Sequence, residues 1–327
     1  MMKIAVVIPC FKVIDHILDV IEGIGVEVMS IYCVDDNCPD KSGIFVQKHC
    51  KDPRVRVIFN SHNGGVGSAT KLGFDVAVED EMDILIKLDG DGQMNPNNIP
   101  KLVFNITEGK ADFCKGNRFY NQSFLKIMPP VRIFGNAILS FAVKLTTGYW
   151  SIVDPTNGYF AIHSSVYKEI NSKNLEDGFL FETSVLFNLA LLGAVVIDIP
   201  IKASYGSEIS NLKIRKIIFP FLKFHFFKFH KRIAVIHFLR GFSIASLELI
   251  FGSLLLSFGL FYGVTKFFQD FLDPFSVTAG QVMLAALPII IGVQFLVSFL
   301  RHDYSVQPHI PINPSLTYKP IKNLSNK

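Results

Sequence analysis

The sequence predicts an α/β domain built on a mainly parallel sheet, followed by a basic segment and two helices long enough to cross a membrane. Two observations lead to this fold class. Apolar runs rich in Val and Ile alternate with helix-like stretches over roughly the first 200 residues. Hydrophobic residues make up 50% of the 327, and the mean hydropathy is +0.36. This composition excludes a disordered chain, a disulfide-rich miniprotein and a collagen-like fibre.

Seven apolar runs that end at turn or polar residues are predicted to be strands. They lie at Lys3–Pro9, Val28–Val34, Val55–Phe59, Asp83–Leu88, Asp112–Gly116, Gly158–His163 and Val195–Ile199. Helices are expected near Ile14–Gly23, Lys41–His49, Gly67–Val78, Arg132–Thr147 and Phe179–Leu192. Because parallel strands place ligand sites beyond their carboxyl ends, the polar residues that follow each strand are candidate site residues.

A basic belt runs from Lys213 to Arg240. It holds eight Lys or Arg residues and no Asp or Glu, so the rest of the chain carries a net charge of −4 although the total is +4. Phe and Ile interleave with the cations, which is typical of amphipathic helices in the membrane interface. An RNA-binding face is the alternative, but the apolar spans that follow directly disfavour it. We therefore expect membrane lipids and no nucleic acid as partners.

Two apolar spans follow the belt, at Phe242–Val264 and Val277–Leu300. They are 23 and 24 residues long and contain a single charge, Glu248, which we interpret as structural. Each is long enough to cross about 30 Å of hydrocarbon. Buried helices of a large soluble domain are the alternative. The segment between the spans is not basic, whereas both outer flanks are, so the positive-inside rule places both termini in the cytosol.

These features divide the chain into four predicted parts and also indicate where the protein is located. The parts are a catalytic domain at 1–212, an interfacial segment at 213–240, two transmembrane helices at 241–302 and a cytosolic tail at 303–327. The five cysteines form an odd number without a CxxC pair, which favours reduced thiols in the cytosol. We expect a multi-pass protein of the inner (plasma) membrane whose catalytic domain lies in the cytosol.

The strongest indication of chemistry is Asp89-Gly90-Asp91, which directly follows the fourth predicted strand. Two carboxylates one residue apart on a turn can hold a hard divalent cation, Mg²⁺ or Mn²⁺, together with substrate phosphates. Such a cation stabilises a diphosphate leaving group. A solvated turn is the alternative, which the position at a strand end disfavours.

Two further polar clusters follow neighbouring strands. Asp35 and Asp36 could accept hydrogen bonds from a ribose hydroxyl or a base N–H. A helix N-cap is the other interpretation for this cluster, and it suits Asp40. The glycine-rich run Asn63–Gly67 could form either a phosphate cradle at a helix N-terminus or a simple tight turn.

Six motifs occur together in a fixed order: IAVVIPCF, VDDNCPD, NGGVGSA, LDGDGQ, GNRF and DPTNGYFAI. With them the chain resembles family 2 glycosyltransferases of the GT-A fold over about residues 3–212. The greatest similarity is to polyprenyl-phosphate glycosyltransferases, the group that includes bacterial GtrB-type enzymes and dolichyl-phosphate mannose synthase. The two apolar spans match the GtrB-like architecture.

The resemblance implies roles for residues on the donor side. Pro9, Asp35 and Asp36 would contact the nucleoside. The metal ion and the diphosphate would be held by Asp89, Asp91 and Gln93, with Asp89 also among the nucleotide-binding residues.

The resemblance also implies roles on the acceptor side. Arg118 and Arg132 would meet the lipid phosphate or the diphosphate, a task that suits the guanidinium fork. Asp154 would lie near the acceptor, as a general base or as a positioning group, and Glu182 is a second candidate for either role. The alternatives are a structural partner for each arginine and a helix carboxylate for Glu182.

The chain departs from the family pattern at several positions. Phe11 replaces a tyrosine, Lys12-Val13 replaces Asn-Glu, and Val66 replaces a basic residue. The segment 203–212 resembles a Tyr-Gly-x-Glu-x-Ser variant of bacterial relatives, which leaves the donor sugar open. The chain has no Gln-x-x-Arg-Trp, which argues against a processive polysaccharide synthase.

The predicted activity is an inverting, metal-dependent transfer of one sugar to polyprenyl (undecaprenyl) phosphate on the cytosolic face. The donor is expected to be a UDP-sugar such as UDP-glucose, and the cofactor Mg²⁺ or Mn²⁺. The resemblance also implies a homo-oligomer, a tetramer. The alternatives are transfer to another lipid or glycan acceptor, which would need a true general base, and a non-enzymic membrane scaffold.

Overall fold

The computed structural model describes residues 2–120, 130–201, 214–273 and 276–317, without the side chains of 130–132 and 214–218. The chain forms two compact units. Unit 1 comprises Met1–Lys228 and Pro308–Lys327, and unit 2 comprises Phe229–Gln307.

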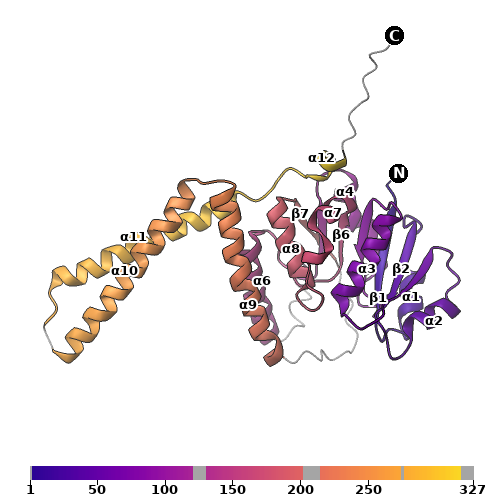
Figure 1. Cartoon of the computed structure of the whole chain (residues 1–327), viewed down its shortest axis with the longest axis horizontal. Helices are drawn as coiled ribbons and strands as arrows, with labels where there is room; N and C mark the ends of the chain where they lie inside the picture. Colours follow the sequence, from indigo (N-terminus) through magenta and orange to yellow (C-terminus); the bar gives the residue numbers. More distant parts are fainter. Residues whose placement is uncertain (1, 121–129, 202–213, 274–275, 318–327) are drawn as a thin grey trace, which may run out of the picture. The chain divides into compact units, whose positions relative to one another are not determined.

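Unit 1 contains a seven-stranded sheet in the order β3-β2-β1-β4-β6-β5-β7 (Figure 1). The strands are β1 (Ile4–Cys10), β2 (Ser30–Asp35), β3 (Val55–Phe59), β4 (Ile84–Lys87), β5 (Phe113–Asn117), β6 (Phe160–His163) and β7 (Val196–Pro200). All seven predicted strands are confirmed. Only β6 runs antiparallel to its neighbours. The segment that leads into β6 therefore lies at the edge where the other strands end.

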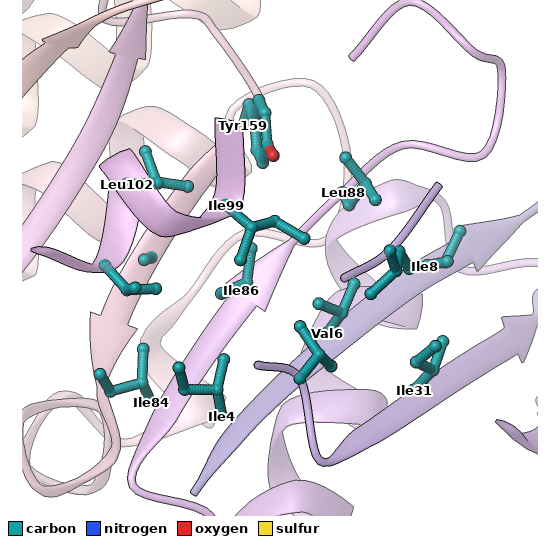
Figure 2. Packing of buried hydrophobic residues seen from close by; sticks show 14 of the residues in the cluster. Ile4, Val6, Ile8, Ile31, Ile84, Ile86, Leu88, Ile99, Leu102 and Tyr159 are labelled. Atoms are coloured by element: carbon teal, nitrogen blue, oxygen red, sulfur yellow. The ribbon is translucent and has the colours of Figure 1, made fainter. Parts of the chain in front are cut away.

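Helices cover both faces of the sheet. One face packs against α1 (Ile17–Glu22), α2 (Ser42–His49) and α4 (Ile99–Thr107), and the other against α3 (Val66–Glu79), α7 (Ser164–Ile170) and α8 (Phe181–Leu192). Side chains alternate along β1, so Ile4, Val6 and Ile8 face α4 while Ala5 and Val7 face α3. Figure 2 shows the first set beneath the α4 residues. Two short 3₁₀ turns, η1 (Pro96–Asn98) and η2 (Ser172–Asn174), complete the layers.

Two longer helices, of which the second ends in unit 2, expose apolar side chains in unit 1. They are α6 (Pro130–Thr147) and α9 (Ile214–Ile233), of which α9 begins the predicted basic belt. Thr146 of α6 and His225 of α9 are hydrogen-bonded at 2.6 Å, so the two helices contact each other at this point. The exposed large apolar side chains are those of Ile133, Phe134, Ile138, Phe141, Phe219, Leu222, Phe226 and Phe227.

The segment after Pro308 belongs to unit 1. The buried Asp112 carboxylate, next to β5, accepts backbone N–H groups from Ile312 at 3.0 Å and from Asn313 at 2.8 Å. It also accepts the backbone N–H of Val195 at 2.7 Å, at the start of β7. Helix α12 (Asn313–Thr317) is thereby fixed to the sheet domain.

Unit 2 is a helical hairpin of α10 (Ile244–Leu272) and α11 (Ala279–Ser305), preceded by a π-helical turn, η3 (Ala234–Leu239). Both predicted spans are confirmed as helices, and both are long and apolar enough to cross a membrane. Their backbones approach closely: a Cβ on Gly292 would lie 2.7 Å from the backbone nitrogen of Leu256. The Glu248 carboxylate accepts a hydrogen bond from Ser298 Oγ on the facing helix at 2.7 Å, consistent with a structural role.

Candidate active site

Two adjoining pockets lie at the carboxyl edge of the sheet. Pocket A, about 390 Å³, is lined by Pro9, Phe11, Val13, Asp36, Asn63, Gly65, Val66, Ala69, Asp89, Gly90 and Asp91. Pocket B, about 230 Å³, is lined by Val66, Lys87, Asp89, Asp91, Gln93, Met94, Arg118, Thr156, Asn157, Gly158, Phe179, Glu182 and Thr183. Asp89 and Asp91 line both pockets, so the predicted metal ligands stand where the two meet.

The turn after β4 presents the carboxylates to this junction. The backbone N–H of Gln93 donates to Asp91 Oδ1 at 3.0 Å, which holds the turn closed. In the parts of unit 1 and unit 2 that the structure describes, no group of three or more His, Cys, Asp and Glu residues could hold a metal ion. Two carboxylates that open onto a cavity still fit Mg²⁺ or Mn²⁺, because these ions commonly take one or two protein carboxylates plus substrate phosphates.

Lys87 lies directly beneath Asp89. Its ammonium donates to Asp89 Oδ1 at 2.6 Å and lies 3.4 Å from Glu182 Oε1, and its side chain is only 1% exposed. Burial lowers the pKa of Lys87, but the carboxylates of Asp89 and Glu182 outweigh burial and hold this pKa above its ordinary value. Lys87 is therefore a buried cation at the floor of pocket B.

The two aspartates after β2 occupy different environments. Asp36 lines pocket A and accepts hydrogen bonds from the backbone N–H groups of Gly64 at 3.1 Å and Gly65 at 2.7 Å. Gly65 has a φ of +88°, a conformation that favours glycine. Asp35 is buried behind the pocket and accepts the backbone N–H groups of Cys38 at 2.7 Å and Gly43 at 2.6 Å. It shapes the start of α2 and does not line either pocket.

Pocket A has an apolar wall formed by the residues that depart from the family pattern. Phe11, Val13 and Val66 all line it, next to Pro9. Phe11 is 41% exposed and extends beyond the end of β1. These side chains can pack against a flat, apolar face of a ligand, while Asp36 and the turn after β4 supply the polar side of the same pocket.

Arg118 follows β5 and is held by Asp154. Its guanidinium donates to Asp154 Oδ2 through Nε at 2.7 Å and to Oδ1 through Nη2 at 2.9 Å. Asp154 is fully buried, whereas the Arg118 side chain is 27% exposed and lines pocket B. A fork–fork contact of this kind fixes the plane of the guanidinium. Asp154 thus presents Arg118 to the cavity.

Asp198 on β7 contacts the residues next to both members of this ion pair. Its Oδ2 accepts the backbone N–H of Val153 at 2.7 Å and the Asn117 amide at 3.1 Å. Burial raises the pKa of Asp198 to about 6. Its contacts fix the two segments that carry Asp154 and Arg118.

The loop that leads into β6 closes pocket B. Buried Lys115 of β5 donates to the carbonyl oxygen of Asn157, and burial lowers the pKa of this lysine to about 8. A Cβ on Gly158 would lie 2.4 Å from Lys87 Nζ, so a larger residue at this position would force the Lys87 ammonium to move. Lys87, Lys115, Gly158 and Asp198 were not among the predicted site residues. The sequence offered one indication of the two lysines: each lies within an apolar strand run, and a lysine that is buried there needs a charged or polar partner.

The structure brings most of the predicted site residues together. Asp36 and Pro9 line pocket A, and Gln93, Arg118 and Glu182 line pocket B with the two aspartates that are predicted to bind the metal. Arg132 lies on α6, and its side chain falls outside the residues that the structure describes. The segment 203–212 also lies outside them.

Residues 5–171 match the model of the family described as Glycosyl transferase family 2. This is half of the chain. The chain belongs to glycosyl transferase family 2. The matched residues include β2 to β6 and all of β1 except Ile4, and they carry Asp89, Asp91, Arg118 and Asp154.

Several family relatives are named for transfer to polyprenyl phosphates. The chain is 26% identical over 204 residues to an undecaprenyl-phosphate mannosyltransferase of Micrococcus luteus, covering 61% of this chain and 83% of that protein. It is also 26% identical to a polyprenol monophosphomannose synthase of Mycolicibacterium smegmatis, covering 58% and 73%. For a dolichol-phosphate mannosyltransferase of Pyrococcus furiosus the identity is 26%, covering 70% and 64%.

Solved structures show the same fold. Glucosyl-3-phosphoglycerate synthase from Mycobacterium tuberculosis, in complex with Mn²⁺, UDP and glucosyl-3-phosphoglycerate, superposes with a TM-score of 0.51 at 15% identity. The match covers 72% of this chain and 81% of that one. The catalytic domain therefore has the GT-A-like mixed sheet that the sequence predicted.

Proposed function

We propose that this protein transfers one sugar from a nucleotide donor to a polyprenyl phosphate, with inversion at the anomeric carbon. One observation carries the proposal: two carboxylates, Asp89 and Asp91, and one guanidinium, Arg118, line the same 230 Å³ pocket. Carboxylates suit a cation on the donor's diphosphate, and a guanidinium suits a phosphate on the acceptor. The names of the relatives support the same acceptor class.

The donor would extend from pocket A to pocket B. Its nucleoside fits the apolar wall at Phe11 and the polar side at Asp36, and its sugar reaches pocket B beside Glu182. Asp89 and Asp91, with Gln93, are the residues that would hold Mg²⁺ or Mn²⁺. When bound, such an ion neutralises charge that develops on the departing diphosphate.

The acceptor phosphate is itself the nucleophile. One of its oxygens attacks the anomeric carbon opposite the departing diphosphate, and the bond from that carbon to the diphosphate oxygen breaks. The phosphate is already ionised near neutral pH, so no strong base is needed. Both Asp154 oxygens accept from Arg118, and this supports a positioning role for Asp154. Arg118 orients the phosphate and offsets its charge.

An apolar pocket beside the site suits a lipid acceptor. Pocket C, about 440 Å³, is lined by Phe119, Ile133, Asn136, Ala137, Ser140, Phe141, Lys144 and Val153. Phe119 and Val153 directly neighbour Arg118 and Asp154 in the chain. The exposed apolar side chains of α6 and α9 support contact with a membrane surface.

The path of the chain supports cytosolic placement of both termini. The segment after α11 returns to the catalytic unit through Asp112, which requires an even number of membrane crossings. The basic belt precedes α10, and Arg301 lies near the end of α11. We propose that both flanks and the catalytic unit face the cytosol. The homo-oligomer expected from the resemblance stays a prediction.

The donor sugar has two candidates. The sequence favours a UDP-sugar such as UDP-glucose, whereas the mannosyltransferase names of three relatives favour GDP-mannose. The test incubates the purified chain with undecaprenyl phosphate, Mg²⁺ or Mn²⁺ and a panel of nucleotide sugars, followed by mass analysis of the lipids. We expect one new glycosyl phospholipid, absent with Asp91→Asn.

The same assay separates the rival functions. If the sugar is transferred to diacylglycerol but not to undecaprenyl phosphate, the proposed acceptor is wrong and a lipid hydroxyl takes its place. No product with any donor or acceptor, from a chain that remains folded and membrane-bound, would favour a scaffold.

A further inference from the structure

Two buried lysines lie in one row across the sheet. Lys87 of β4 and Lys115 of β5 both pair with Phe160 of the central antiparallel strand β6. Residues directly opposite one another in a sheet project from the same face. Both lysines therefore stand on the face that α8 covers, and both are buried beneath the loop that leads into β6.

The two ammonium groups have different partners. Lys115 donates to a backbone carbonyl oxygen, that of Asn157. Lys87 instead joins two carboxylates from distant parts of the chain, Asp89 after β4 and Glu182 in the first turn of α8. Both of these carboxylates line pocket B. Without Lys87, two negative charges would face each other at the floor of that pocket.

Gly158 lies next to all three charged groups. A Cβ at this position would lie 2.4 Å from Lys87 Nζ, 3.1 Å from Asp89 Oδ2 and 3.3 Å from Glu182 Oε1. The Gly158 backbone thus rests on all three groups and shields the ammonium from solvent. An ion pair held in this way keeps a fixed geometry, because no water competes for the ammonium.

We propose that Lys87 is a positioning residue, which clamps Asp89 and Glu182 together and thereby holds the Asp89 carboxylate toward the donor's diphosphate and its cation. The inference rests on the proposed function, because it assigns the clamped carboxylate a task in donor binding. Groups that hydrogen-bond to a metal-binding carboxylate orient it, and their removal typically weakens metal affinity by about 10- to 100-fold.

The test measures Mn²⁺ binding by electron paramagnetic resonance in the presence of UDP and, separately, of GDP. We compare the wild-type chain with Lys87→Met and with Lys115→Met, the matched control in the same row. The expected result is a Mn²⁺ affinity weakened about 10-fold or more by Lys87→Met and less than about 3-fold by Lys115→Met. The thermal midpoint of each variant shows that it is folded.

Two results would overturn the proposal: Mn²⁺ affinity unchanged in folded Lys87→Met, or equal losses in both lysine variants. If Lys87→Met does not fold, Lys87→Gln takes its place with the same criteria, because it keeps a polar group of similar length. Failure of the proposed function gives a different pattern. A wild-type chain that binds Mn²⁺ with a nucleotide but transfers no sugar overturns the transfer reaction and leaves the Lys87 comparison valid. A wild-type chain that binds no Mn²⁺ overturns the Lys87 proposal, while sugar transfer with Mg²⁺ by the same chain leaves the proposed function standing.

Discussion

Two clusters of buried ion pairs in this chain differ in how far their charged groups are exposed. In the catalytic unit, Asp154 is fully buried but its partner Arg118 is 27% exposed and lines pocket B. In the hairpin unit, Arg232 donates to both oxygens of Asp303 at 2.6 and 3.1 Å, and each side chain is only 2% exposed. His237 lies 2.9 Å from the same carboxylate.

The difference shows that burial and charge alone do not identify a functional site. Both clusters have fork–fork geometry, and both carry a strong penalty for removal of one partner. The open cluster presents a charged atom to a ligand-sized space, pocket B, whereas both side chains of the closed cluster are almost completely buried. The closed cluster satisfies its charges internally and joins the start of the hairpin, near η3, to the end of α11. We interpret the open cluster as functional and the closed one as structural.

The sharpest test of the open site is Asp91→Asn. Sugar transfer should fall by about 1,000-fold or more, because the cation proposed to stabilise the leaving group would lose a charged ligand. The thermal midpoint should stay close to wild type, since the asparagine oxygen can still accept the Gln93 N–H. The exposed Asp40→Asn is the matched control. Unchanged turnover in Asp91→Asn would remove this aspartate from the site.

The closed cluster should respond in stability and not in chemistry. Asp303→Ala leaves Arg232 buried without its carboxylate and should cost about 3 to 5 kcal/mol of stability. Thermal unfolding in detergent, with activity normalised to folded protein, measures both effects. If Asp303→Ala lowers turnover per folded molecule and leaves stability unchanged, the interpretation of the closed cluster as structural is wrong.

Asp154 should act through Arg118. Asp154→Asn is expected to lower kcat/KM for undecaprenyl phosphate by about 100-fold, because the guanidinium loses its fixed orientation. Arg118→Ala should cause a similar loss, and the double variant should be no worse than Arg118→Ala alone. Fully additive losses in this cycle would instead show that Asp154 has a task of its own, such as that of a base.

The smallest expected effect concerns Asp198, the buried carboxylate on β7 that contacts the segments carrying Asp154 and Arg118. Its folded pKa of about 6 lies above the ordinary value of 3.8, so the folded state binds this proton more tightly than the unfolded state. Stability should therefore fall as pH rises from about 4 to 6, and the cost is fully present above pH 6. Asp198→Asn removes this charge and keeps an acceptor for the Val153 N–H.

The variant should gain about 1 to 3 kcal/mol at pH 8 relative to wild type, and the gain should vanish near pH 4. Chemical unfolding at the two pH values measures this difference. A gain of equal size at both values would show that the carboxylate does not titrate in this range.

The sequence predicted the architecture because each element carries its own local pattern. Apolar strand runs, the breaks between them and the two long apolar segments depend on neighbouring residues. All seven strands are confirmed, and both segments are confirmed as helices long and apolar enough to cross a membrane. The Asp89–Asp91 turn was predicted for the same reason, since its residues are adjacent and follow a strand. By contrast, α4, α7 and α12 were not predicted, and their burial depends on packing against the sheet.

Other parts of the site could be found only in the tertiary structure. Asp35 and Asp36 are adjacent in sequence, yet only Asp36 faces pocket A, because successive groups at a strand end point in opposite directions. The pairing of Arg118 with Asp154 and of Lys87 with Glu182 joins residues 36 and 95 positions apart. Such partners are set by the tertiary path of the chain: the segment with Asp154, which leads into the antiparallel β6, lies at the carboxyl edge of the sheet, and the first turn of α8 brings Glu182 to the same pocket. No local pattern encodes this path.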